Sequence, residues 1–205
     1  MSNVATSMRT LPPPSRGIAP AKFAHVVLKT ANYAAMIEWY ATVLQARVVF
    51  RNEFIAFLTY DDEHHRVAII KVPGGRAADA DAAGVHHIAF TYANLGDLLS
   101  TYRRLKERGI EPVRCINHGP TTSMYYCDPD GLRVELQIDN FATAEEGQAY
   151  LVGPDFADNP IGVIYDPEGL IRDYEAGVTL DELIRRPPLP PGKTPMDMRA
   201  ERPRS

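Results

Sequence analysis

The chain has 205 residues, of which 45% are hydrophobic and 23% charged, as in ordinary globular proteins. Its formal net charge of −4 gives no electrostatic reason to expect nucleic acid or anionic lipid as a partner. No apolar run approaches the roughly 20 residues of a membrane span, and the N-terminus has no apolar signal core. Cys115 and Cys127 form no CxxC pair, so we expect a cytoplasmic protein without disulfides.

The first 22 residues are rich in proline, serine and small residues, which predicts a flexible N-terminal arm. A regular pattern begins at residue 23. It consists of a strand, a helix with apolar side chains at helical spacing, and three further strands separated by polar turns. These elements are expected at residues 23–30, 31–45, 46–52, 53–60 and 65–72.

The same order of elements returns after a small-residue linker at 74–84. The second set is expected at residues 85–92, 95–109, 111–117, 122–128 and 132–138. The sequence therefore predicts an internal repeat of two βαβββ modules, about 23–72 and 85–139. We expect an α+β domain over 23–140, in which the two modules form a half-open mixed β-barrel around a metal site.

Residues 141–205 form a C-terminal extension with a different pattern. We expect one or two short helices, one of them at "TLDELIRR", where Thr179 and Glu182 have the spacing of a capping box. The extension is expected to pack on the modules or on a partner subunit. Its last 15 or so residues, rich in proline and arginine, are expected to be disordered.

Superposing the two modules identifies candidate metal ligands. Setting "FAHVVLKT" on "VHHIAFTY" places His25 on His87, and setting "HRVAII" on "LRVELQ" places Ala68 on Glu135. If the modules pair about a pseudo-twofold axis, two imidazoles and one carboxylate converge, with a methyl group at the fourth corner. Two histidines and one carboxylate leave positions open on a metal, as non-haem Fe(II) and O₂ chemistry requires. His86 is expected to point to the opposite face of its strand.

The segment "NHGPTTSMYYCDPDGLRVELQ" (117–137) is similar to one found in type I extradiol ring-cleavage dioxygenases. "FAHVVL" and "GVHHIAF" resemble motifs of the wider vicinal-oxygen-chelate superfamily, which also contains glyoxalases and bleomycin-resistance proteins. The resemblance covers residues 23–140. The chain departs from well-known members of the family in lacking an additional N-terminal pair of modules and in carrying the extension.

The resemblance implies a role for six residues. His25, His87 and Glu135 match the ligands of Fe(II), a set that also admits Mn(II). His65 matches a histidine that borders the O₂ site, although His64 beside it leaves an ambiguity that the repeat alignment resolves in favour of His65. The two residues that match the contacts of the substrate oxygens are His118 and Tyr125. The implied substrates are O₂ and a catechol-type aromatic diol, and we expect a homo-oligomer.

Three alternative functions remain open at this stage. A metal-dependent lyase or isomerase of the glyoxalase type shares the fold but usually has a carboxylate or similar ligand at the position of Ala68. A non-catalytic small-molecule-binding relative commonly lacks the three ligands. A metalloprotein with the same ligands and a different reaction is separated from a dioxygenase only by its substrates.

Overall fold

The computed structural model describes residues 19–76 and 82–200. The first module forms a four-stranded sheet, here called sheet A, with strand order β1-β4-β3-β2. Strand β1 runs parallel to β4, and the other neighbours are antiparallel. The elements of this module are β1 (Val26–Thr30), α1 (Tyr33–Val43), β2 (Arg47–Arg51), β3 (Ile55–Thr59) and β4 (Val67–Lys71).

The second module repeats this topology in sheet B, whose order is β5-β8-β7-β6-β9. Again the first strand is parallel to the last strand of its module. A short strand from the extension, β9 (Val163–Ile164), pairs antiparallel with β6 and becomes the edge of the sheet. The module's own elements are β5 (His87–Thr91), α2 (Leu95–Lys106), β6 (Arg114–Asn117), β7 (Thr121–Cys127) and β8 (Arg133–Asp139). The α+β class and the two βαβββ modules are therefore confirmed, as two open sheets rather than a closed barrel.

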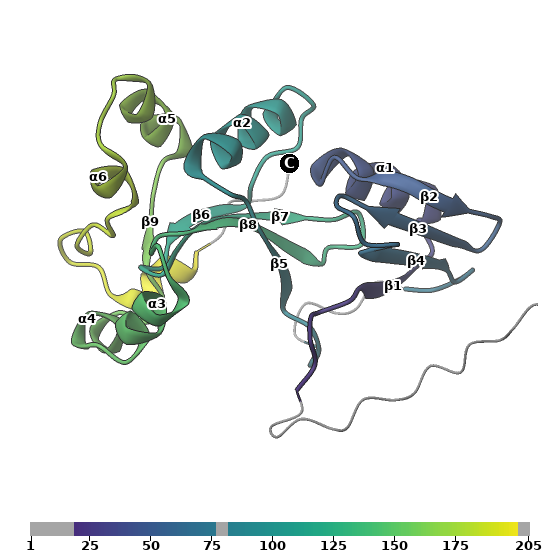
Figure 1. Ribbon diagram of the computed structural model, residues 1–205, viewed down its shortest axis with the longest axis horizontal. Coiled ribbons are helices and arrows are strands. Elements are labelled where there is room, and N and C mark those ends of the chain that lie inside the picture. Colours follow the sequence, from purple (N-terminus) through teal and green to yellow (C-terminus); the bar gives the residue numbers. More distant parts are fainter. Residues whose placement is uncertain (1–18, 77–81, 201–205) are drawn as a thin grey trace, which may run out of the picture.

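In Figure 1 the two sheets lie side by side, with the extension beyond sheet B on the side away from sheet A. Helices α1 and α2 contact each other, and each packs on its own sheet. Their buried apolar side chains and those of the sheet faces beneath them belong to one continuous hydrophobic cluster. The core therefore lies between helices and sheets, which leaves the opposite face of each sheet for other contacts.

The extension contains more regular structure than the one or two helices expected from the sequence. Its helices begin at good N-caps: Thr143 and Glu146 form a reciprocal capping box, and Asp166 accepts two backbone N–H bonds. The predicted pairing of Thr179 with Glu182 is confirmed. The helices are α3 (Ala144–Leu151), α4 (Pro154–Asp158), α5 (Pro167–Glu175) and α6 (Leu180–Ile184).

Part of the segment expected to be disordered is regular. Residues Pro195–Arg199 form a 3₁₀ helix, η1, and Met198 is buried beside β9 in a small apolar cluster. A composition rich in proline and arginine does not reveal a single apolar anchor such as Met198. Residues 201–205, the arm at 1–18 and the centre of the linker at 77–81 lie outside the described residues. No helix in the described ranges is long and apolar enough to cross a membrane.

A buried hydrogen bond joins the two modules. The Tyr40 hydroxyl on α1 donates to Oδ2 of Asp128, in the turn between β7 and β8, over 3.1 Å. Tyr40 is fully buried and Asp128 nearly so. The other carboxylate oxygen of Asp128 accepts the backbone N–H groups of Asp130 and Leu132. Because this carboxylate has little access to water, it depends on the bonds that the protein supplies.

We expect Tyr40→Phe to lower the free energy of unfolding by about 1–3 kcal/mol, because it leaves a buried carboxylate without one of its donors. Urea denaturation monitored by circular dichroism measures the change. Tyr60→Phe, at an exposed tyrosine of sheet A, is the matched control and should change stability by less than about 0.5 kcal/mol. Equal stability of Tyr40→Phe and the wild type would show that the bond contributes nothing to holding the modules together.

Candidate active site

The face of sheet B that is turned away from α2 carries a polar row across four strands. The strand register places Arg114, Tyr125, Glu135 and Ala89 next to one another on β6, β7, β8 and β5. Residues directly opposite in neighbouring strands point to the same face of a sheet. His87 lies on this face as well, two residues before Ala89 on β5.

The corresponding row of sheet A is apolar. There the register aligns Phe50, Phe57, Ala68 and Val27 across β2, β3, β4 and β1. The two rows occupy matching places in the repeat, so Ala68 takes the place of Glu135, as the superposition of the modules predicted. One module therefore presents polar groups and the other presents aromatic and aliphatic ones.

Glu135 and His87 form the closest pair of predicted metal ligands. Nε2 of His87 lies 2.9 Å from Oε2 of Glu135, and only 4% of Glu135 is exposed. Burial alone would raise the pKa of Glu135, but hydrogen bonds from His87, Ser123 and Tyr125 bring it below its usual value. The carboxylate is therefore held in its charged form.

The donor chemistry of this pair fits iron or manganese. The hydrogen bond between His87 and Glu135, 2.9 Å from Nε2 to Oε2, holds the two donor atoms side by side. An imidazole nitrogen and a carboxylate oxygen are also the donor types that Fe(II) and Mn(II) accept.

His118 and Tyr125 lie beside His87 and Glu135. These four side chains are called the polar group below. His118 follows β6, and its Nε2 lies 3.0 Å from the Tyr125 hydroxyl and 3.9 Å from Oε1 of Glu135. Burial lowers the pKa of His118, which favours the neutral ring, and burial beside Glu135 raises the pKa of Tyr125 well above its usual value. The Tyr125 hydroxyl reaches both the Glu135 carboxylate and His118, so its one proton has two acceptors.

Sequence reasoning missed three groups of this site. The Ser123 hydroxyl bonds to Glu135, the Arg114 guanidinium lies 4.5 Å from the centre of the Tyr125 ring, and the carbonyl oxygen of Ile161 contacts His118. Ser123 lies two residues before Tyr125 on β7, and residues two apart in a strand point to the same face. Strand periodicity could therefore have identified Ser123. Nothing in the local sequence links Ile161 to His118.

His25 and His65 form a second group on sheet A. Their ring centres are 4.3 Å apart, and the His65 ring stacks on Phe57 of the apolar row. Burial and the neighbouring His25 and His64 lower the pKa of His65. His25 itself is exposed, directly before β1.

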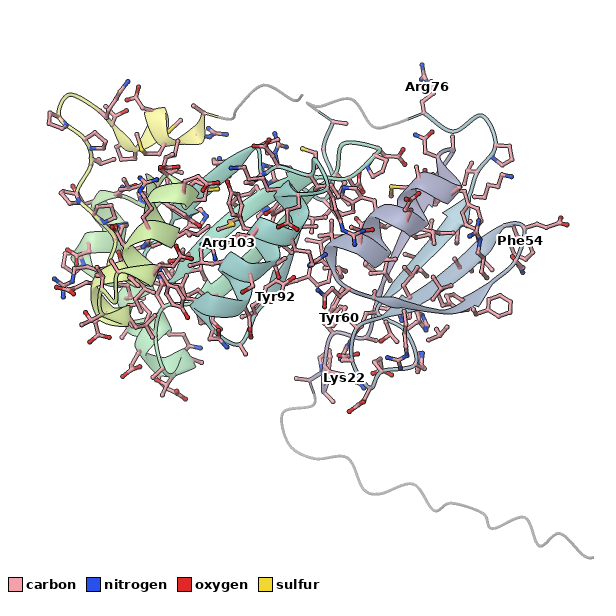
Figure 2. All side chains as sticks on the ribbon, turned by 90° about the horizontal axis from the view of Figure 1, so that it is seen from above. Lys22, Phe54, Tyr60, Arg76, Tyr92 and Arg103 are labelled. Carbon is pink, nitrogen blue, oxygen red and sulfur yellow. The ribbon has the colours of Figure 1, made fainter. Side chains whose placement is uncertain are left out.

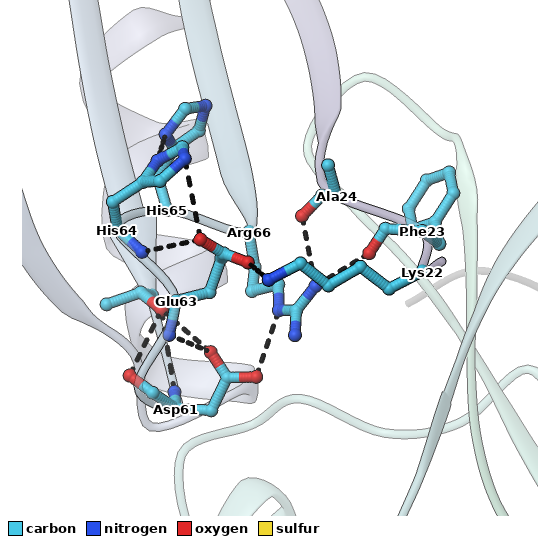
Figure 3. A network of polar contacts seen from close by, with 9 residues as sticks. Lys22, Phe23, Ala24, Asp61, Glu63, His64, His65 and Arg66 are labelled. Atoms are coloured by element: carbon cyan, nitrogen blue, oxygen red, sulfur yellow. Dashed lines mark hydrogen bonds and ion pairs between the residues drawn. The ribbon is translucent and has the colours of Figure 1, made fainter. Parts of the chain in front are cut away.

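A polar network fixes the segment before β1 on the β3–β4 turn (Figure 3). The Arg66 guanidinium donates to the carbonyl oxygens of Phe23 and Ala24 and forms an ion pair with Asp61 at 2.9 Å. Lys22 pairs with Glu63 in the same network. Since these contacts anchor the backbone that leads to His25, they keep its ring beside His65.

Two histidines, His86 and His64, are adjacent to predicted site residues. His86 precedes β5 rather than lying within it, so strand alternation does not apply. Its Nδ1 lies 2.8 Å from Nδ1 of His87, and it borders a cleft between the modules that also contains Lys29 and Arg133. Neither His87 nor Glu135 lines this cleft, and the predicted orientation of His86 away from their face stays a prediction. His64 is exposed, and its Nδ1 lies 2.6 Å from that of His65.

The six predicted residues thus form two groups rather than one. His87, Glu135, His118 and Tyr125 lie together on sheet B, and His25 and His65 lie together on sheet A. Within the described parts of the chain, no three histidine, cysteine or acidic side chains are arranged so that they could hold one metal ion. The fold of a single copy brings together two of the three predicted ligands.

Comparison with known proteins identifies the family. A family model described as the Glyoxalase/Bleomycin resistance protein/Dioxygenase superfamily matches residues 22–136. Biphenyl-2,3-diol 1,2-dioxygenase 2 of Rhodococcus globerulus is 50% identical over 166 residues, which cover 80% of this chain and 87% of that protein. Biphenyl-2,3-diol 1,2-dioxygenase 3 of the same organism is 48% identical over 167 residues, 80% of this chain and 88% of that protein.

A solved structure supports the fold. The glyoxylase/bleomycin resistance protein/dioxygenase domain from Frankia sp. EAN1pec aligns with a TM-score of 0.50 at 17% identity. The alignment covers 59% of this chain and 99% of that domain, so the extension lies largely outside the shared fold. From the two βαβββ modules, the family match and the dioxygenase relatives, we conclude that the chain belongs to the Glyoxalase/Bleomycin resistance protein/Dioxygenase superfamily.

Proposed function

We propose that the chain is an Fe(II)-dependent extradiol dioxygenase that opens the ring of a catechol-type diol with O₂. The observation that carries this proposal is the polar group on sheet B, where His87 and Glu135 lie beside Tyr125 and His118. Curated relatives at about half identity are biphenyl-2,3-diol 1,2-dioxygenases, which supports ring cleavage as the reaction class. Mn(II) would satisfy the same ligands.

The residues of the polar group have distinct roles in this proposal. His87 and Glu135 would hold the iron, which would supply a common centre for both substrate oxygens and O₂. His118 Nε2 accepts a proton from the diol, since burial keeps its ring neutral. Tyr125, whose raised pKa keeps it protonated, donates a hydrogen bond to a substrate oxygen. The apolar row of sheet A offers aromatic side chains to the substrate ring.

We further propose that a second copy completes the site and that the protein is a homo-oligomer. The third predicted ligand is His25, and the residue predicted to border the O₂ site is His65. Both lie on the face of sheet A that carries the apolar row, apart from the other ligands. Val27 and Phe50 of that row are 48% and 47% exposed, and Phe54 projects from the outer end of the same sheet (Figure 2). An exposed apolar face suits contact with another protein surface. In the proposed assembly, this face of one copy, which carries the missing ligands, packs against the polar row on sheet B of a second copy. We place the protein in the cytoplasm, where thiols such as Cys115 stay reduced.

A glyoxalase-type lyase or isomerase is disfavoured by Ala68. The side chain at this position is a methyl group, 1% exposed and paired with Val27 and Phe57 in neighbouring strands. No carboxylate is available there to act as a fourth ligand, and three protein ligands leave room for both a bidentate diol and O₂.

Oxygen uptake tests the function directly. The protein, reconstituted with Fe(II) without air and then exposed to O₂, should consume it with at least one member of a panel of monocyclic, biphenyl-type and fused-ring catechols. A visible absorption band of the ring-opened product should appear at the same rate. Protein prepared without metal is the control. Absence of O₂ consumption with every diol would refute the proposed activity, and product formation from a 2-oxoaldehyde and a thiol would favour the lyase.

A further inference from the structure

The C-terminal extension contacts His118 of the candidate active site through a backbone carbonyl. The oxygen of Ile161 lies 2.6 Å from Nδ1 of His118. A carbonyl oxygen only accepts hydrogen bonds, so at this distance Nδ1 carries the proton. In a neutral imidazole the other nitrogen then has a lone pair, and Nε2 of His118 directs it toward the Tyr125 hydroxyl at 3.0 Å.

A turn at residues 159–162 holds this carbonyl in place. Oδ1 of Asn159 accepts the backbone N–H groups of Ile161 and Gly162 at 3.1 and 2.9 Å, and its Nδ2 donates to the Gly162 carbonyl at 2.9 Å. Asn159 is only 3% exposed, so all of these bonds are made in the interior. Arg186 secures the turn from outside by donating to the Asn159 carbonyl at 2.6 Å.

The turn is also pressed against the backbone that leads into His118. Gly162 has a φ of +107°, and a Cβ at this position would stand 2.4 Å from the carbonyl oxygen of Asn117. Immediately afterwards β9 begins, and Val163 pairs with Asn117 on β6. Glycine is therefore required both by the backbone conformation and by the close approach. The pairing and the close approach hold the segment that carries the Ile161 carbonyl beside His118.

We infer that the Asn159–Gly162 turn is a positioning element that fixes the proton of His118 on Nδ1 and turns the Nε2 lone pair toward the substrate. Such bonds to the distal nitrogen decide which imidazole nitrogen is available for chemistry. The catalytic consequence rests on the proposed function, whereas the position of the proton does not. The extension is thereby part of the active site, although none of its side chains belongs to the polar group on sheet B.

Nitrogen-15 NMR of the histidine rings tests the inference without requiring activity. Long-range proton–nitrogen spectra of the full-length protein, prepared without iron at a pH well above the histidine pKa, report which ring nitrogen carries hydrogen. His118→Gln assigns the signal. We expect a neutral Nδ1–H ring in the wild type and a mixture with the Nε2–H form in Asn159→Ala. Asn159→Asp keeps an acceptor for both N–H groups but replaces the Nδ2 donor to the Gly162 carbonyl with a carboxylate oxygen, so it should restore the wild-type pattern only in part.

A matched control exists in the first module. Asn52 also accepts two backbone N–H groups, from Phe54 and Ile55, but lies far along the chain from His118 in a turn of sheet A. Asn52→Ala should leave the His118 spectrum unchanged. If Asn159→Ala does not fold, Arg186→Ala loosens the same turn from outside and should produce the same mixture of ring forms.

Activity provides the second readout. If ring cleavage is established, Asn159→Ala should lower kcat by about 10–100-fold with little change in KM. An Nε2–H ring in the wild type, or an unaltered ring in both folded variants, would overturn the inference. Because the spectra need no substrate, a protein that cleaves no catechol would refute the proposed function while leaving this result standing.

Discussion

We expect Glu135→Ala to abolish both iron binding and ring cleavage. Glu135 is the only acidic residue in the polar row, and the hydroxyl of Ser123 and the ring of His87 both bond to it. Alanine removes the negative charge that would balance a divalent cation in a buried site. Removing an outer hydrogen-bond partner of a metal ligand lowers metal affinity or activity by roughly 10–100-fold. The loss of iron affinity and of activity in Glu135→Ala should be larger.

Iron content by elemental analysis and O₂ uptake measure the two effects separately. Gln137→Ala is the matched control, because Gln137 lies two residues further along β8 on the same face and bonds to Thr91. It should keep full iron content. Stoichiometric iron in Glu135→Ala would show that the ligand assignment is wrong, even if activity were lost.

We expect two inactive variants to restore activity when they share a dimer. His25→Ala and Glu135→Ala alter different modules, and each alone should be inactive. In a twofold dimer whose sites are shared between copies, a mixed dimer has one site with both substitutions and one with neither. Co-expressed with two different tags and purified through both, it should show about half the wild-type turnover per dimer.

The control uses two substitutions in the same module. A mixed dimer of His87→Ala and Glu135→Ala has a defect in both of its sites and should be inactive. Light scattering establishes the oligomeric state of each preparation. Inactivity of the His25→Ala and Glu135→Ala mixture in a confirmed mixed dimer would show that both modules of one site come from the same chain.

The repeat made most of the fold and half of the site predictable. Every strand and helix of the two modules appears where the hydrophobic pattern indicated it, since those patterns reflect which face of each element is buried. The register of β8 against β5 follows from the same alternation, which is why Glu135 and His87 meet as the superposition predicted.

The distance between the modules was not predictable in this way. It depends on contacts such as the bond from Tyr40 to Asp128, between residues 88 positions apart in the chain. Hydrophobic periodicity and motif spacing describe one helix or strand at a time. They contain no information on contacts between residues that are distant in the chain. For the same reason, the contact between Ile161 and His118 could not be predicted from the sequence.

The exposed edge of sheet A limits how copies of this chain can associate. Among residues 19–76 and 82–200, strand β2 has no neighbour on its outer side, and all five of its residues, "RVVFR", are exposed. A short apolar edge of this kind is a hazard for aggregation. If two copies paired antiparallel through this edge, centred on Val49, Arg47 of each would face Arg51 of the other, and like charges directly opposite destabilise a sheet. The two arginines therefore disfavour pairing of this edge in that register, as charged residues beside an apolar strand do.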